Sequence, residues 1–436
     1  MGLLGRVRSQ GGGAPAGDPE GPVRESLRRD LVDRLGLADV ARLVREEEPA
    51  RAREELSVAC DALLNGEGYG SLPPEARERV RREVLDQILG LGLLQPLMDD
   101  PSVTEIMVNG TQSLYFERDG RIAEAPRVFE SPDQIMLVVD RILAPLGRRL
   151  DESCPIVNAR LANGDRVNAV IAPVAVDGPA VTIRRFTGRI GSLARLVELG
   201  SIPSWYATML SWAVRLRQDV AVVGGTGSGK TTLLNALSLE IPAGERIVTI
   251  EDSAELAFDP SLHVVRLEAR GASIEGTGAV TIRDLVTNAL RMRPDRIVVG
   301  EVRGGEAVDM LQAMNTGHDG SLTTLHAGSE HEAVVRLVLM ARLGMDVPAS
   351  LIEEQVASAL DLVVMGKRLA GGARRVTSAS AVGRAPGGTV ELEPLVAYDE
   401  VSDRWELVRE PAFVAEGLAG GLLGEGEVAA WRSSLG

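Results

Sequence analysis

One short segment constrains the fold of this chain more than any other feature. Residues 224–231 read Gly-Gly-Thr-Gly-Ser-Gly-Lys-Thr and satisfy the pattern GxxxxGK[ST]. The unbroken apolar run DVAVVG precedes this segment, and the helix-like stretch TTLLNALSLE follows it. A glycine-rich turn between a buried strand and a helix lets successive backbone N–H groups converge on phosphate oxygens, and the positive end of the helix adds to the attraction. The sequence therefore predicts a phosphate-binding loop in an α/β domain.

The loop residues have separate predicted roles. We expect Lys230 to contact the β- and γ-phosphates of a nucleoside triphosphate, and the Thr231 hydroxyl to coordinate Mg²⁺. Only Lys230 and Lys367 are lysines among the 47 Lys and Arg residues, which indicates that a compact ammonium group is needed here. A glycine-rich turn that matches the pattern by chance would not explain the flanking strand and helix. The predicted nucleotide-binding residues are Gly225, Thr226, Gly227, Ser228, Gly229, Lys230, Thr231 and Thr232.

The hydrophobic pattern changes along the 436 residues. Residues 1–25 are glycine-rich at the start and are predicted to be a disordered tail. Residues 26–96 carry apolar side chains at steps of three and four, which predicts a small helical unit. Residues 97–188 mostly alternate with period two and contain turn signals, which predicts an α+β domain. Residues 189–436 contain the continuous apolar runs of a mostly parallel sheet covered by helices, and we expect them to end in an acidic tail.

Charge and cysteine content disfavour several classes of protein. The formal net charge of −15 argues against broad binding to nucleic acid, which requires a basic surface. No run of 18 uncharged apolar residues occurs and no signal-peptide pattern opens the chain, so we expect a cytoplasmic protein without membrane insertion. Cys60 and Cys154 match no metal or redox spacing, and we assign them no chemistry.

Carboxylates follow two of the predicted strands downstream of the loop. RIVTIED ends in Glu251-Asp252 and is followed by Glu255, whereas RIVVGE ends in Glu301 and is followed by Arg303. A metal-bound triphosphate needs such groups to hold Mg²⁺ and to orient the attacking water. Taken singly, each carboxylate is more often a helix cap or a solvated residue. Their joint occurrence downstream of a phosphate loop favours a catalytic role.

Two of the four histidines lie in one segment, TGHDGSLTTLHA. No third ligand of suitable spacing accompanies them, which argues against a metal site. His326 ends a predicted strand and is placed to sense a γ-phosphate. His318 is equally well explained as a structural histidine.

Together and in this order, these motifs resemble those of the secretion ATPases of type II and type IV secretion and of type IV pili, most closely the CpaF-like branch of Flp/Tad pili. GGTGSGKTT is similar to their Walker A motif, IEDSAEL to the Asp box, RMRPDRIVVGEVRGGE to the atypical Walker B motif, and TGHDGSLTTLHA to the His box. DPSVTEIMVNG, PLGRRLDESCPIVNARL and DGPAVTIRRF resemble the N-terminal domain of that branch. The resemblance covers residues 97–367.

The resemblance implies an α/β fold in which a RecA-like P-loop ATPase domain follows an α+β, PAS-like N-terminal domain. It implies that ATP and Mg²⁺ bind between the two domains and that six chains form a ring. Glu255 would then polarise the attacking water, Glu301 would be the Walker B glutamate near Mg²⁺, and His326 would be the His-box residue. The implied metal-binding residues are Thr231 and Glu301.

The family also directs arginines of its N-terminal domain at the phosphates. Arg184 and Arg185 follow the predicted strand VTI, and Arg160 and Arg166 flank the turn at Asn163-Gly164. An arginine that arrives on domain closure supplies on the order of 10³ to 10⁵ in rate. Each of these arginines is equally well explained as a surface residue, and the sequence does not show which one acts or whether it acts on its own protomer.

We therefore expect Mg²⁺-dependent ATP hydrolysis by a homohexameric motor that powers Flp/Tad-type pilus assembly or protein secretion. The motor would lie at the cytoplasmic face of the membrane and bind an inner-membrane platform protein. Two alternatives stay open: a conjugative DNA-transfer ATPase, and a nucleotide-gated assembly module with little turnover. The predicted catalytic residues are Lys230, Glu255, Glu301, His326, Arg184 and Arg185.

Overall fold

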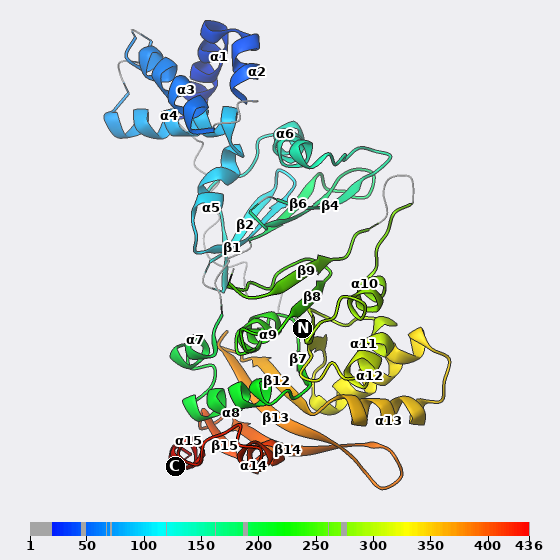
Figure 1. Ribbon diagram of the computed structural model, residues 1–436. Coiled ribbons are helices and arrows are strands. Elements are labelled where there is room, and N and C mark those ends of the chain that lie inside the picture. Colours follow the sequence, from blue (N-terminus) through cyan, green and yellow to red (C-terminus); the bar gives the residue numbers. More distant parts are fainter. Residues whose placement is uncertain are drawn as a thin grey trace, which may run out of the picture. The chain divides into compact units, whose positions relative to one another are not determined.

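The computed structural model describes residues 20–44, 49–66, 68–69, 72–118, 120–161, 163–185, 191–259, 261–271 and 277–435. The chain divides into two compact units, Met1–Thr187 and Gly188–Gly436. Each unit has its own sheet and its own hydrophobic core, and both sheets are visible in Figure 1.

The N-terminal unit begins with a group of four helices. Their bounds are α1 Gly21–Leu35, α2 Leu37–Val44, α3 Pro49–Leu64 and α4 Pro74–Leu89. Apolar side chains at helical spacing, including Leu27 and Leu31 of α1 and Val80 and Val84 of α4, form one buried cluster. The pattern that predicts a helical unit therefore has its expected cause, which is burial of one face of each helix.

The predicted disordered tail ends earlier than expected. Helix α1 begins at Gly21, with a proline in its first turn that fixes a helical φ. Arg24 is buried, and its Nη1 lies 2.9 Å from Glu83 Oε2 of α4. This ion pair and the proline explain why residues 21–25 are helical, and the prediction for residues 1–19 falls outside the described residues.

A six-stranded antiparallel sheet with the order β3-β2-β1-β6-β5-β4 completes this unit. Helix α6, Pro132–Leu143, is capped by Ser131, whose hydroxyl accepts a hydrogen bond from the Gln134 N–H. Ile135 and Val139 of α6 belong to the same buried cluster as the apolar residues of the sheet, which makes this part α+β. The strands are β1 Val103–Asn109, β2 Ser113–Arg118, β3 Arg121–Glu124, β4 Ile156–Arg160, β5 Arg166–Val170 and β6 Ala180–Arg184.

The C-terminal unit is built on a nine-stranded sheet with the order β15-β14-β13-β12-β7-β11-β10-β8-β9. Six neighbouring strands, from β12 to β9 in that order, are parallel, and β13, β14 and β15 extend the sheet antiparallel. The parallel strands are β7 Val220–Gly224, β8 Ile247–Glu251, β9 Val264–Glu268, β10 Arg296–Val299, β11 Leu322–His326 and β12 Leu362–Arg368. The extension is β13 Arg374–Arg384, β14 Val390–Asp399 and β15 Arg404–Leu407.

Helices cover both faces of this sheet. Alternate residues of β7 belong to different cores: Val220 and Val222 pack with α7, α8, α9, α14 and α15, whereas Ala221 and Val223 pack with α10, α11, α12 and α13. A strand that is buried on both faces is expected to be a continuous apolar run, which is the pattern of DVAVVG. The helices are α7 Leu193–Glu198, α8 Ser204–Arg215, α9 Lys230–Ser238, α10 Ile282–Ala289, α11 Glu306–Met314, α12 Glu330–Gly344 and α13 Ala349–Ala359.

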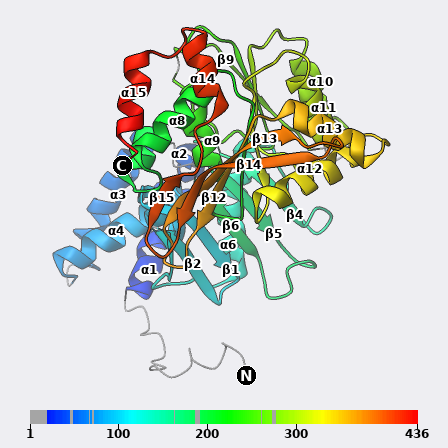
Figure 2. The ribbon, with the colours of Figure 1, turned by 90° about the horizontal axis from the view of Figure 1, so that it is seen from below.

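The expectation of an acidic C-terminal tail is wrong. The segment forms two helices, α14 Ala412–Ala419 and α15 Glu425–Ser433, and Figures 1 and 2 place both beside α8. Trp431 is buried, its indole N–H donates to the Trp205 carbonyl at 2.8 Å, and its ring lies edge-on to Trp212 at 5.3 Å between centroids. The many acidic and glycine residues of this segment hide its helical pattern in the sequence. A few apolar side chains, among them Phe413 and Val428, nevertheless pack these helices into the hydrophobic core.

The amino ends of the parallel strands are held by a buried arginine. Arg296, the first residue of β10, is fully buried and forms an ion pair with Glu245 at 2.6 Å. Its guanidinium also donates to the carbonyl oxygens of Gly320 and Val214, each at 3.0 Å. A buried charge needs this degree of pairing, because its desolvation is otherwise costly.

None of the helices in the described part of the chain combines the length and the low charge content required to cross a bilayer.

Candidate active site

The predicted phosphate-binding loop connects β7 to α9, as its sequence context requires. Gly224 ends β7, and a Cβ at this position would collide with the carbonyl oxygen of Gly366 and the hydroxyl of Ser228. Gly229 precedes α9 with a φ of 94°, in the left-handed region that favours glycine. These contacts explain why a tight, glycine-rich connection is needed between this strand and this helix.

Lys230 is buried at the start of α9, and its ammonium group faces the loop. Nζ donates to the Gly225 carbonyl at 3.1 Å and lies 3.3 Å from His326 Nδ1. His326 reaches this position because β11 is parallel to β7, and its register places His326 opposite Gly224. Burial lowers the pKa of Lys230, while the charge of Glu301 acts in the opposite direction.

Glu301 extends this cluster from the end of β10. Its Oε1 lies 2.9 Å from His326 Nε2, and its Oε2 accepts a hydrogen bond from Arg303 Nε at 2.9 Å. Arg303 Nη1 lies 3.7 Å from Asp252 Oδ2, so the same arginine bridges the ends of β10 and β8. Burial and the neighbouring Lys230 lower the pKa of His326, which favours an uncharged imidazole at neutral pH.

Glu251 positions the segment that carries Glu255. It ends β8 and is buried, and its Oε1 accepts hydrogen bonds from the backbone N–H groups of Glu255 at 2.7 Å and Leu256 at 3.0 Å. The Asn235 side chain of α9 accepts a further hydrogen bond from Ala257 N–H at 2.9 Å. Glu255 itself is half-buried. The Asp-box segment is therefore attached both to its own strand and to the helix that follows the phosphate-binding loop.

Two polar atoms of this region are buried without a hydrogen-bond partner in the described structure: Ser228 Oγ and Glu251 Oε2. Buried polar atoms are nearly always satisfied, so such a group points to a ligand, an ion or water. The Ser228 hydroxyl in the loop and the carboxylates of Glu251 and Glu301 at the ends of β8 and β10 match the donor set that a magnesium-bound triphosphate and its attacking water require. The residues present therefore fit that substrate.

The predicted loop residues differ in exposure. Lys230 and Ser228 are buried, Thr231 is half-buried and Thr232 is exposed. Thr231 lies in the first turn of α9, beside the loop, as expected for a hydroxyl that coordinates Mg²⁺. The other predicted members of the loop are Gly225, Thr226, Gly227 and Gly229.

His318 has the structural role that the sequence left open. Its Nδ1 lies 3.2 Å from the Ala313 carbonyl near the end of α11, and its own carbonyl accepts a hydrogen bond from the Ser321 hydroxyl at 2.7 Å. These hydrogen bonds stabilise the turn between α11 and β11. Of the two clustered histidines, His326 alone contacts Lys230 and Glu301.

The structure does not support the predicted catalytic role of Arg185. Its Nη1 donates to the carbonyl oxygens of Leu97 at 3.1 Å and Asp100 at 3.3 Å, and its Nε lies 3.2 Å from the buried Asp165. The guanidinium is therefore engaged inside the N-terminal unit. The sequence gives no sign of this, because its partners are two carbonyl groups and a carboxylate of the hairpin turn.

Arg184 belongs instead to a row of three arginines. In the antiparallel register, Arg160 of β4 lies directly opposite Arg166 of β5, and Arg166 lies directly opposite Arg184 of β6. Directly opposed residues of antiparallel strands point to the same face of the sheet. Their alternation with buried Val167 and Ile183 puts this row on the face opposite the core.

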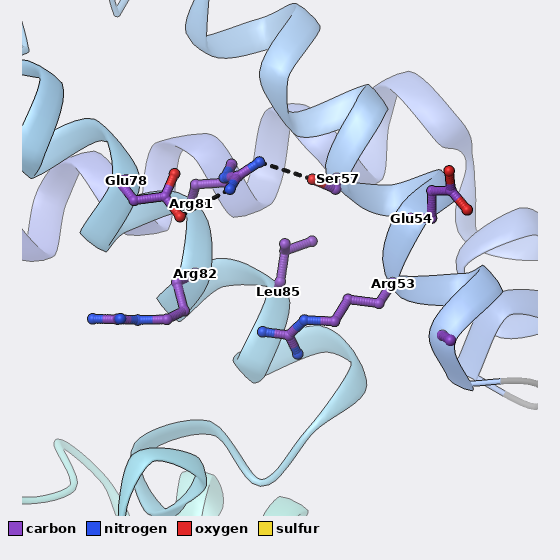
Figure 3. A pocket seen from close by; sticks show the side chains of 8 residues that line it. Arg53, Glu54, Ser57, Glu78, Arg81, Arg82 and Leu85 are labelled. Atoms are coloured by element: carbon purple, nitrogen blue, oxygen red, sulfur yellow. Dashed lines mark hydrogen bonds and ion pairs between the residues drawn. The ribbon is translucent and has the colours of Figure 1, made fainter. Parts of the chain in front are cut away.

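A groove between α3 and α4 is lined by none of the predicted site residues. Its residues, most of them visible in Figure 3, are Ala50, Arg53, Glu54, Ser57, Glu78, Arg81, Arg82 and Leu85. Arg81 donates to Ser57 at 3.0 Å and to Glu78 at 2.8 Å. Arginine and glutamate side chains form ion pairs and hydrogen bonds with one another there, as is usual where two exposed helix faces meet. None of the described residues that line the groove belongs to a glycine-rich loop.

The order of the parallel strands, with the glycine-rich loop after β7 and carboxylates after β8 and β10, defines a RecA-like P-loop domain. Residues 88–386 match the family model described as type II/IV secretion system protein, and the chain belongs to this family. The match covers the sheet of the N-terminal unit and most of the C-terminal unit, and it begins near the end of α4.

Similar proteins come from several bacteria. A Mycobacterium tuberculosis protein, named provisionally as a conjugal transfer protein, is 36% identical over 312 residues, which are 70% of this chain and 88% of the relative. The type IV secretion system protein PtlH of Bordetella pertussis is 37% identical over 312 residues, 65% of this chain and 91% of PtlH. The crystal structure of the VirB11 ATPase from the Brucella suis type IV secretion system, with sulphate, is 30% identical. The alignment covers 66% of this chain and 95% of VirB11, with a TM-score of 0.37.

Proposed function

We propose that this protein hydrolyses magnesium-bound ATP and uses the energy to drive a secretion or pilus-assembly machine. The observation that carries this proposal is the contact series from Gly225 through Lys230 and His326 to Glu301, at the ends of three neighbouring parallel strands. It joins the loop that would hold the phosphates to a carboxylate that would act beside the metal.

In this proposal the groups of the site have distinct tasks. Loop N–H groups and Lys230 bind the phosphate oxygens, and Thr231 and Glu301 hold the metal that arrives with ATP. Glu255 orients the water, and Glu251 holds the backbone from which Glu255 projects. An uncharged His326 between Lys230 and Glu301 responds to a change in charge at the γ-phosphate by changing its hydrogen bonds.

The machine that the protein serves is proposed from likeness. The motifs support a Flp/Tad-type pilus or a protein secretion system, in which six chains form a ring that binds a platform protein at the cytoplasmic face of the inner membrane. The names of the relatives favour type IV secretion, including conjugative DNA transfer, as a second candidate. Pull-down of membrane proteins with the full chain separates the two, since a pilus platform protein should be recovered only in the first case.

Replacement of Glu255 by glutamine should abolish most turnover and preserve ATP binding. An amide cannot accept a proton or polarise water as a carboxylate does, so we expect kcat to fall about 10²-fold or more. Steady-state phosphate release and equilibrium binding of a fluorescent ATP analogue measure the two properties. Asp259→Asn, on the exposed part of the same segment, is the matched control.

The result decides between the enzyme and the alternative of a nucleotide-gated module. Hydrolysis by Glu255→Gln protein at the wild-type rate would overturn the assignment of Glu255. ATP binding without measurable hydrolysis by the wild-type chain, at concentrations that form rings, would favour the gated module.

For the N-terminal unit, we propose that Arg184 contacts the phosphates and that Arg185 is structural. Arg184→Ala should lower kcat about tenfold to 10²-fold, less than a full arginine finger because Arg160 and Arg166 remain in the row. It should leave the unfolding midpoint unchanged, whereas Arg185→Ala should lower that midpoint because it removes the contact of Arg185 with the buried Asp165 and its hydrogen bonds to Leu97 and Asp100. Phosphate release and thermal unfolding of both variants test this assignment, and the reverse pattern of effects would refute it.

A further inference from the structure

The hairpin formed by β12 and β13 approaches the phosphate-binding loop from one side. Strand β12 pairs with β7 so that Gly366 lies opposite Gly224, the first glycine of the loop. The hairpin continues beyond this pair and turns at residues 369–373, where Leu369 N–H donates to the Ala373 carbonyl at 2.8 Å. Register places Arg368 directly opposite Arg374, so both side chains project from the same face.

Arg374 contacts the loop directly. Its Nε donates to the carbonyl oxygen of Gly227 at 3.0 Å, and its Cδ lies 3.4 Å from the position that a Cβ on Gly229 would occupy. Arg368 Nη1 lies 3.5 Å from the corresponding position on Gly227. Two side chains of the hairpin thus lie against the loop, beside Gly227 and Gly229, whose φ values are both positive.

The contact with the Gly227 carbonyl determines the orientation of a peptide group. In a trans peptide the C=O of one residue and the N–H of the next point in opposite directions. When Arg374 holds the Gly227 carbonyl, the Ser228 N–H must point away from the hairpin, and it donates a hydrogen bond to the Gly225 carbonyl at 3.4 Å. Lys230 Nζ donates to that same Gly225 carbonyl, so the Ser228 N–H lies on the side of the loop that the Lys230 ammonium group faces.

The other face of the hairpin provides a contrast. Lys367 and Arg375 are also directly opposite each other, and each is paired with a carboxylate: Lys367 with Glu400 at 2.7 Å and Arg375 with Asp403 at 2.9 Å. These pairs connect the hairpin to the β14–β15 turn. Arg374 differs from them in that its contact is a carbonyl group of the loop.

We propose that Arg374 is a positioning residue for ATP binding, in addition to the loop residues themselves. It acts through the Gly227–Ser228 peptide, whose N–H it directs at the phosphates and whose donor strength its positive charge increases. This inference rests on the proposed ATPase function.

Three variants test the proposal in the full-length chain. Arg374→Ala should raise the Kd for a fluorescent ATP analogue about tenfold, the effect of losing one charge-assisted hydrogen bond, and should raise KM more than it changes kcat. Arg374→Lys should restore most of the affinity, because an ammonium group can also donate to a carbonyl. Arg375→Ala, the adjacent arginine on the other face, should bind ATP as the wild type does and unfold at a lower temperature.

Each result has one meaning. If Arg374→Ala binds ATP with wild-type affinity while the wild type itself binds, the inference is wrong and the proposed function is unaffected. If Arg374→Ala lowers the unfolding temperature of the nucleotide-free protein as much as Arg375→Ala does, Arg374 is only a structural residue. If the wild-type chain binds no ATP, the proposed function fails, and the inference fails with it.

Discussion

Replacement of Lys230 by alanine should reduce ATP hydrolysis by at least about 10³-fold, a loss of about 4 kcal/mol of transition-state stabilisation. Lys230 is buried in the loop, and its ammonium group lies between the Gly225 carbonyl and His326. Charge that develops on the transferred phosphoryl group is stabilised there without reorganisation of water. Alanine removes that charge, and no other lysine of the chain lies near the loop's interior. Phosphate release under saturating ATP measures the effect.

The chain offers a matched control for this experiment. Lys367, its second lysine, is exposed and forms an ion pair with Glu400 at 2.7 Å. An exposed pair of this kind contributes little, so Lys367→Ala should keep its activity and almost all of its stability. Hydrolysis by Lys230→Ala within tenfold of the wild-type rate would mean that the loop is not the catalytic phosphate site.

Replacement of Gly320 by alanine should destabilise the C-terminal unit by about 3–5 kcal/mol, or prevent its folding. Gly320 has a φ of 81°, and a Cβ there would collide with the guanidinium of Arg296. Arg296 would have to move, and it would lose its contacts with Glu245 and Val214, leaving a buried arginine poorly paired. Urea unfolding, followed by tryptophan fluorescence, measures this loss.

Gly317, three residues earlier, allows the effect of the positive φ to be separated from the effect of displacing Arg296. Its φ of 92° is also in the left-handed region, but no atom lies within 4 Å of the position of its Cβ. Gly317→Ala should therefore cost only the backbone term, about 1–2 kcal/mol. Equal destabilisation by the two substitutions would show that displacement of Arg296 contributes nothing.

The sequence predicts the parts of the fold that depend on local patterns. Continuous apolar runs such as DVAVVG predict buried parallel strands, and the glycine-rich segment predicts its place between β7 and α9. The prediction fails where a few anchors decide the structure. Trp431 and Phe413 bury the C-terminal helices within a segment that is otherwise rich in glycine and glutamate, and Arg24 and Pro22 start α1 inside the predicted tail.

The candidate site is predicted in the same uneven way. Lys230, Glu301 and His326 are found from motifs, and the parallel order of the strands brings them together. The contact of Arg374 with Gly227 joins residues 147 positions apart in the sequence and involves a backbone carbonyl, which leaves no pattern in the side chains. The contacts of Arg185, which favour a structural role over the predicted catalytic one, escape the sequence for the same reason, since its partners include two carbonyl groups.

Because β7, β10 and β11 are parallel, the candidate active site lies at the carboxyl ends of these strands, and the ion-pair cluster that stabilises the sheet lies at their amino ends. The carboxyl ends carry the loop, Glu301 and His326, whereas the amino ends carry Arg296 with its partners Glu245 and Gly320. Substitutions near the carboxyl ends can then alter the proposed turnover without lowering the stability of the sheet. Substitutions near the amino ends can change thermal stability without altering the proposed reaction. Under the proposed function, a lineage of such proteins could therefore adapt to a new growth temperature and to a new rate of ATP turnover through separate sets of mutations.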